Sequence, residues 1–246
     1  MNSTLSNIDY QSPMYLQLRE IIRTKIEDGD FPPGTAIPTE HELAKTYGIN
    51  RLTVRNGIAA LVNEGLLKRI QGKGVYVLGE KREQDLETLE GFSQMVRKKN
   101  ANPSSQILAK SLRPAGHKYG KIFTIDPADQ IFYIKRVNYI DREPYSLEEI
   151  YIPHAVVPEL EDIDLSVFSV YEIYDFYNID IAYSRQTLDL TQLDQSDARF
   201  LDVDSSTPLL LFTNTSYNAA EAVMEYSRSC TRPDKANYKV NFSTKG

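Results

Sequence analysis

Two helix patterns separated by only three residues, 48–50, constrain the fold of this chain more than any other feature. Thr39 and Glu42 have the spacing of a capping box, in which each side chain bonds the other residue's backbone amide. Asn50 is a strong N-cap for a second helix that starts at Arg51. Two helices joined by so short a connection predict a helix-turn-helix.

A further helix pattern precedes this pair and a hairpin pattern follows it. Residues 66–70 and 75–78 indicate two strands around the glycine-rich tip 71–74. Residues 13–28 carry apolar side chains at helical spacing, namely Tyr15, Leu18, Ile22 and Ile26. Three helices followed by a two-stranded wing predict a winged helix-turn-helix domain over residues 1–79.

The helix that begins at Arg51 is polar in its first turns and apolar in its second half. Arg51, Thr53 and Arg55 are the polar residues that would point outward. A helix inserted end-on into a major groove needs this gradient, with base and phosphate contacts at its N-terminus and core packing behind. A solvated amphipathic helix would show the same pattern, so the helix alone leaves both interpretations open.

The hairpin tip favours a nucleic-acid interface. Gln71, Gly72 and Lys73 combine a donor, a position without a side chain and a cation, and glycine permits close approach to a groove. A tight turn that happens to carry lysine is the ordinary alternative. Residues 1–79 hold nine Lys or Arg against eight Asp or Glu, whereas residues 80–246 hold 19 against 26. The front of the chain is therefore the part that can approach phosphates.

The remainder of the chain predicts a linker and a second domain. Residues 80–88 are charged and indicate the linker, so the second domain spans 89–246. A short helix near 92–99 precedes strand patterns, and two more helices are expected near 169–178 and 195–202. The strand patterns are 105–112, 131–140, 144–152, 181–190, 208–217 and 222–231. Consecutive strand pairs with segregated helices predict an α+β fold with an antiparallel sheet.

Across about 65 residues, the N-terminal motifs resemble the GntR family of bacterial repressors. The resemblance implies that Arg51, Thr53 and Arg55 contact DNA, with help from His41, Asn50, Gln71 and Gly72. Two departures are Asn50, where a serine is usual, and Gly57-Ile58, where Ala-Leu is usual. The motifs that carry the resemblance are Pro13-Met14-Tyr15, Gly29 to Gly34, Pro38 to Ala44, Asn50 to Arg55, Glu64-Gly65-Leu66 and Gln71 to Gly74.

The second domain is similar to the UTRA effector-binding domain of the HutC-type subgroup, whose fold resembles chorismate lyase. The helical subgroup with a three-histidine metal site does not fit, because the chain's histidines are His41, His117 and His154, of which only two lie in the second domain, and the segment is rich in strand patterns. The aminotransferase-like subgroup needs a longer chain. The motifs that carry the similarity are Leu89 to Ser93, Ile134 to Val137, Tyr151-Ile152-Pro153, Ser169-Val170-Tyr171 and Met224 to Ser227.

The UTRA resemblance also implies an effector site. Arg136 and the hydroxyls of Ser169 and Tyr171 would hold an anionic group of the effector. Glu148 and Glu225 would accept hydrogen bonds from hydroxyls or an amine of the effector. Asn138 and Gly91 replace an arginine and a serine of the sugar-phosphate-binding relatives, which weakens the case for a phosphate. The expected effector residues are Gly91, Phe92, Ser93, Arg136, Asn138, Glu148, Ser169, Tyr171 and Glu225. Each of them also fits an ordinary structural role.

Composition and motifs narrow the function classes. The single cysteine, Cys230, cannot form an intramolecular disulfide, and no secretion signal or membrane-length apolar run is visible, so we expect a cytoplasmic protein. A structural DNA-coating protein is disfavoured by the acidic second domain. No catalytic residues, metal ligands or cofactor motif stand out. The sequence predicts a homodimeric regulator. We expect a repressor that a sugar, sugar phosphate or other small metabolite releases from double-stranded operator DNA. The alternative is an enzyme of chorismate-lyase-like fold fused to a DNA-binding head.

Overall fold

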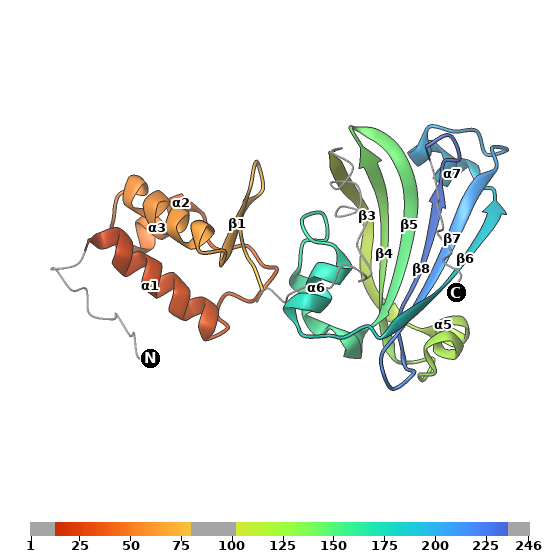
Figure 1. Cartoon of the computed structure of the whole chain (residues 1–246), viewed down its shortest axis with the longest axis horizontal. Helices are drawn as coiled ribbons and strands as arrows, with labels where there is room; N and C mark the ends of the chain where they lie inside the picture. The colour runs from red at the N-terminus through yellow and green to blue at the C-terminus, as the bar shows by residue number, and fades with distance from the viewer. Residues whose placement is uncertain (1–12, 80–101, 236–246) are drawn as a thin grey trace, which may run out of the picture. The chain divides into compact units, whose positions relative to one another are not determined.

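The computed structural model describes residues 13–79 and 102–235, and the chain divides into two compact units (Figure 1). Within the described residues, the first unit contains 13–79 together with Asp162–Phe168 and Glu172–Asn178, and the second contains the rest. The linker expected at 80–88 and the helix expected near 92–99 lie outside the described residues.

The first unit holds the predicted three helices and two-stranded wing. Strands β1 and β2 pair antiparallel, and the register places Leu67 opposite Val77. A bridge between Ala36 and Tyr76 adds the segment before α2 to the hairpin. The elements are α1 (Met14–Glu27), α2 (Glu40–Tyr47), α3 (Arg51–Asn63), β1 (Leu67–Ile70) and β2 (Gly74–Val77). The winged helix-turn-helix prediction is confirmed.

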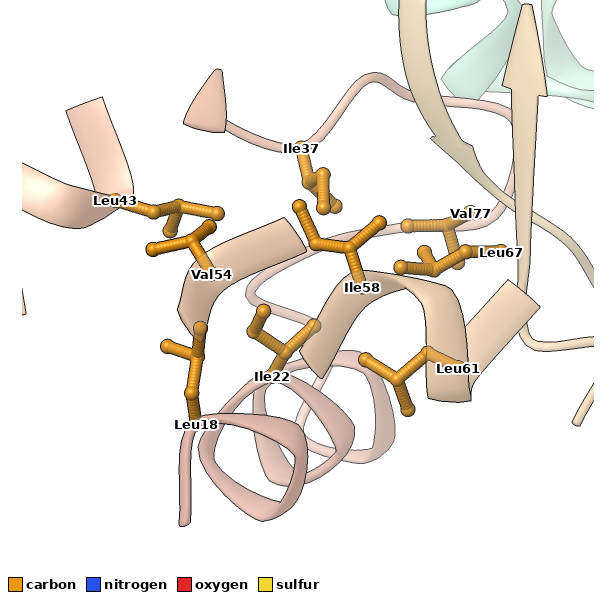
Figure 2. Close-up of a cluster of buried hydrophobic side chains, with 9 residues drawn as sticks. All are labelled: Leu18, Ile22, Ile37, Leu43, Val54, Ile58, Leu61, Leu67 and Val77. Carbon is orange, nitrogen blue, oxygen red and sulfur yellow. The ribbon is translucent and has the colours of Figure 1, made fainter. Parts of the chain in front are cut away.

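One apolar core holds the three helices and the wing together. Leu18 and Ile22 of α1 point towards α3, where Val54, Ile58 and Leu61 receive them (Figure 2). The remaining members of this core are Ile37, Leu43, Leu67 and Val77. The apolar second half of α3 is thus committed to packing, which leaves its polar first turns outside the core.

Gly57, the residue that departs from the family pattern, lies where α3 passes close to α1. A Cβ atom at this position would stand 3.1 Å from the backbone oxygen of Tyr15 and 3.4 Å from a methyl carbon of Leu18. The missing side chain therefore allows the two helices to approach, which offsets the weak helix propensity of glycine.

The capping box at the start of α2 is formed. The Glu42 amide donates to the Thr39 hydroxyl at 3.3 Å, and the Thr39 amide donates to the Glu42 carboxylate at 2.8 Å. Hydrogen bonds from the Thr39 hydroxyl and amide hold the pKa of Glu42 below its usual value. The contribution of this carboxylate to the cap is therefore present at neutral pH and is lost as the pH falls through the lowered pKa.

Replacing Thr39 with alanine is expected to lower the free energy of unfolding of the first unit by about 1 kcal/mol, because the Glu42 amide loses its acceptor. Urea denaturation of the full chain measures the change. Thr46→Ala is the matched control, since Thr46 is exposed within the same helix and caps nothing. Equal losses in the two variants would contradict the role assigned to Thr39.

The first unit also includes two segments from later in the chain. The Tyr177 hydroxyl donates to the Pro33 carbonyl at 2.8 Å, and the Tyr76 hydroxyl donates to Asp164 at 3.4 Å. These segments contain the end of η2 (Pro158–Asp162) and most of α6 (Val170–Phe176).

The second unit is built on a six-stranded antiparallel sheet in the order β3-β4-β5-β8-β7-β6. Its strands are β3 (Pro103–Pro114), β4 (Gln130–Ile140), β5 (Glu143–Pro153), β6 (Tyr183–Thr191), β7 (Leu209–Tyr217) and β8 (Val223–Thr231). All six lie within three residues of the strands predicted from sequence, and the predicted antiparallel α+β class is confirmed.

Helices cover one face of this sheet at its two ends (Figure 1). At one end, α5 (Gly116–Phe123) packs on Ile131 and Tyr151. At the other end, α7 (Gln195–Ala198) leads into η3 (Arg199–Leu201), and Leu201 packs on Val137 and Leu147. Helix α5 was not predicted from the sequence. The short η1 (His154–Val156) follows β5, and the His154 ring lies 5.4 Å from the Phe132 ring on the other face.

Candidate DNA-binding surface and effector site

The N-terminal end of α3 presents the polar residues expected to contact DNA. Asn50 caps the helix, and its side-chain oxygen accepts from the Thr53 amide at 2.8 Å and from the Thr53 hydroxyl at 3.0 Å. Arg51 and Arg55 are both exposed. The cap leaves the neighbouring amides and the two guanidinium groups at the positive end of the helix dipole, which suits a phosphate or a guanine edge.

Arg55 is held in place by Glu40, the first residue of α2. The Glu40 carboxylate accepts from Arg55 at 3.2 Å with one oxygen and from Arg69 of the wing at 3.1 Å with the other. Burial alone would raise the pKa of Glu40, but the hydrogen bonds and charges of Arg55 and Arg69 outweigh it and lower the pKa. This carboxylate therefore orients two cations on one surface.

Leu52 is a residue on this surface that sequence reasoning missed. Its relative exposure is 65%, although it is a large apolar residue in the first turn of α3. An apolar side chain at the tip of a recognition helix can contact a thymine methyl group in the major groove. In the sequence, Leu52 directly follows Arg51 and falls outside the apolar arc of Val54, Ile58 and Leu61. This position was the signal that could have identified it.

The wing tip and α2 supply the remaining predicted residues. Gln71, Gly72 and Lys73 form the exposed turn between β1 and β2, and Gly72 has a φ of 76°. His41 is exposed on α2. The Lys73 ammonium donates to the Ser166 hydroxyl within the first unit, so a phosphate contact by Lys73 requires this bond to be exchanged.

Polar residues are concentrated inside the second unit. Strand partners point to the same face of a sheet, and the register of β4, β5, β8 and β7 places eight of these residues on the face that carries Arg136. The ninth, Ser169, directly precedes α6. We call this set the polar cluster; within the described residues it consists of Arg136, Asn138, Ser146, Ser169, Asn214, Ser216, Glu225, Ser227 and Thr231.

An ion pair lies at one end of the polar cluster. The Arg136 Nε donates to a Glu148 oxygen at 2.6 Å, and Asn138 donates to the same oxygen at 3.0 Å. Asn138 also donates to the Ser146 hydroxyl at 3.2 Å and accepts from Ser105 at 2.7 Å. Three predicted effector residues are thus joined in one network, which fixes the guanidinium beside a carboxylate.

Tyr171 lies at the other end of the polar cluster. Asn214 donates to the Tyr171 hydroxyl at 3.4 Å and to the Ser216 hydroxyl at 3.0 Å. Burial first, and then the nearby charge of Glu225, raise the pKa of Tyr171. The phenol therefore stays protonated at neutral pH and is able to donate a hydrogen bond.

The predicted effector residues are thus brought together in part. Arg136, Asn138 and Glu148 share one network, whereas Tyr171 lies near Glu225. Gly91, Phe92 and Ser93 lie outside the described residues. Sequence reasoning missed Ser105, Ser146, Asn214, Ser216 and Ser227. The signal for the last three was their spacing, since Asn214 and Ser216 lie two residues apart in β7 and Ser227 lies two residues after Glu225 in β8.

Among residues 13–79 and 102–235, the side chains of His, Cys, Asp and Glu form no group that would hold a metal ion. In the same residues, no helix has the length and apolar character required to cross a membrane.

A winged helix with exposed arginines, together with a sheet unit that encloses polar side chains, defines the class of DNA-binding regulators that carry a separate sensor domain. Residues 14–77 match the bacterial regulatory proteins of the gntR family, and residues 98–237 match the UTRA domain. The chain belongs to the GntR family of transcriptional regulators and carries the UTRA domain of its HutC-type members.

Curated relatives of similar length carry repressor names. The chain is 31% identical over 235 residues to the HTH-type transcriptional repressor NagR of Bacillus subtilis (strain 168), covering 94% of this chain and 96% of that protein. It is 30% identical to the mannosyl-D-glycerate transport/metabolism system repressor MngR of Escherichia coli (strain K12), covering 94% and 95%. The crystal structure of PhnF from Mycobacterium smegmatis has a TM-score of 0.60 at 22% identity, covers 94% of this chain and 100% of that chain, and shows a shared fold.

Proposed function

We propose that this regulator is a repressor that binds operator DNA with the first turns of α3 and the wing. A small molecule bound at the polar cluster releases the repressor from the operator. The observation that supports the DNA contact is the exposed pair Arg51 and Arg55 at a capped helix N-terminus. His41, Asn50, Thr53, Gln71, Gly72 and Lys73 complete the proposed surface. It acts in the cytoplasm, where operator DNA lies.

The proposed effector site consists of the polar cluster with Glu148 and Tyr171, and of Gly91, Phe92 and Ser93, which come from the UTRA resemblance. Arg136 is already paired with Glu148 at 2.6 Å, so an anionic effector would have to compete for the guanidinium. The many hydroxyl and amide groups suit a polyhydroxylated ligand. The domain acts as a sensor, and the ligand leaves unchanged.

A homodimer is the proposed binding form, with two first units on one inverted repeat. A single winged helix covers one half-site and reaches limited affinity. Pairing two of them makes the second contact intramolecular, which raises the overall affinity without a new contact. The dimer contacts are placed in the second domain, 89–246.

The effector proposal is tested on a duplex obtained by selection from a random library with the full chain. Neutral sugars, amino sugars and their phosphates are then screened for release of that duplex. A releasing compound should bind at the polar cluster, and operator DNA should weaken its binding by the factor by which it weakens DNA binding. Recovery of the compound unchanged supports a sensor, whereas its conversion to a product would favour the enzyme alternative.

A further inference from the structure

Strand β6 is one edge of the sheet that the described residues form. Among the described strands it pairs only with β7, through nine consecutive residues without a register shift. Natural sheet edges are usually blunted by bulges, prolines or lysines. The opposite edge, β3, has a bulge between Ile107 and Ala109 and begins and ends with proline. Strand β6 has no bulge, proline or lysine, so its backbone remains suited to pairing.

Large apolar side chains are exposed along this edge. Leu188 is 50% exposed and Leu190 is 73% exposed, and both point to the same face because they are two residues apart in a strand. The other face of β6 carries charge. Arg185 lies over the rings of Tyr183 and Tyr217, at 5.7 and 5.2 Å, and these contacts hold the guanidinium on that face.

The charges on β6 are spaced symmetrically. Arg185 and Asp189 lie two residues on either side of Thr187, on one face of the strand. Within the described part of the chain neither has an opposite charge as a partner, and Asp189 accepts only a long hydrogen bond, 3.5 Å, from the Thr187 hydroxyl. A strand with this pattern is complementary to a second copy of itself in antiparallel orientation.

We propose that β6 pairs antiparallel with β6 of a second copy in a register centred on Thr187, so that the two sheets become continuous. This inference rests on the dimer of the proposed function and names its contact surface. A two-fold axis perpendicular to the sheets makes each face of one sheet continuous with the same face of the other. Residues that point to the same face must then pair, so the axis passes through a residue position rather than between two residues. Centred on Thr187, Arg185 lies opposite the partner's Asp189 on both sides of the axis. Centres at Gln186 or Leu188 would place Arg185 opposite a threonine.

The same register serves the apolar face. The two copies of Leu188 become diagonal neighbours across the strand pair, within reach of one another. The exposed Leu188 of each monomer is thereby covered as the backbone hydrogen bonds form.

A charge exchange tests the register. Sedimentation equilibrium of the full chain is expected to show a dimer. Arg185→Asp and Asp189→Arg each set like charges opposite one another twice, and each should raise the dimer dissociation constant roughly tenfold or more. The double variant restores opposite charges and should return to within about threefold of the wild type. Ser111→Asp on β3 is the control and should leave the constant unchanged.

Three outcomes would overturn the inference: a monomeric wild type, single variants that dimerise normally, or a double variant that fails to recover. Leu188→Lys provides a second test, since it adds a charge to the apolar face and should also weaken the dimer. Circular dichroism of each variant checks folding. Binding of a duplex with one half-site, measured on the same samples, separates this result from the proposed function, because dissociated variants should still bind it.

Discussion

Replacing Arg136 with alanine is expected to lower the free energy of unfolding of the second unit by about 3 kcal/mol, the lower end of the range for broken buried ion pairs. Arg136 is buried, and its guanidinium bonds Glu148 at 2.6 Å. The alanine variant leaves the Glu148 carboxylate with one amide donor, Asn138, in a poorly solvated position. The Glu148 side chain retains 16% exposure, which softens the penalty.

A variant that removes both charges separates this cost from the loss of a ligand contact. Arg136→Met combined with Glu148→Gln should be closer to wild-type stability than Arg136→Ala, because no unpaired charge remains buried. Denaturant unfolding of each full chain measures the difference. If Arg136→Ala were as stable as the wild type, the ion pair would not contribute to the second unit.

The ion pair also affects how effector mutations are interpreted. A loss of response in Arg136→Ala arises either from a missing ligand contact or from a loosened sheet, and the response alone does not distinguish them. The charge-neutral double variant does, because it keeps the cluster packed while removing the guanidinium. A response that returns in the double variant would assign Arg136 a structural role.

Replacing Arg51 with alanine is expected to weaken binding of the selected operator by about 1–3 kcal/mol and to relax sequence preference at one position. Arg51 is exposed at the start of α3, outside the apolar core, so its loss removes a DNA contact without disturbing packing. Arg55→Ala should have an effect of the same size, with an added loss because Glu40 then keeps only Arg69 as a cation partner.

Arg23→Ala is the matched control for both arginine variants. It removes the same charge from the first unit, but Arg23 lies on α1 and pairs with Glu64 at 2.5 Å. Fluorescence anisotropy at several salt concentrations gives the affinity and the salt slope, which should become shallower only when a phosphate contact is lost. Equal losses in Arg23→Ala and Arg51→Ala would mean that net charge, rather than the recognition helix, governs binding.

Much of the first unit was predictable because its signals are local. A capping box, an N-cap and a glycine-rich hairpin each act within a few residues, and the structure contains all three. The strands of the sheet were likewise predictable from alternating side chains and turns. Helix α5 was not, since its eight residues include two glycines and no side chain caps it. Its stability comes from packing on Ile131 and Tyr151, which a local pattern does not reveal.

The candidate site was predictable only where a family motif marked it. Arg136 and Glu148 are twelve residues apart and meet because a tight hairpin sets the register of β4 and β5. Asn214 and Ser216 became recognisable only when the register showed which face they share with Arg136. The glycine at position 57 was not predictable for the same reason. It accommodates the approach of α1, a helix about forty residues earlier in the chain.

The central claim is that two copies of α3, one from each chain of a dimer, contact the two half-sites of an operator with their N-terminal ends. Selection from a random duplex library tests it most directly. The wild-type chain should enrich an inverted repeat, whose two half-sites face opposite directions. The double variant Arg51→Ala, Arg55→Ala should fold normally and enrich no repeat. Enrichment of the same sequence by both proteins, or no enrichment by the wild type, would contradict the account.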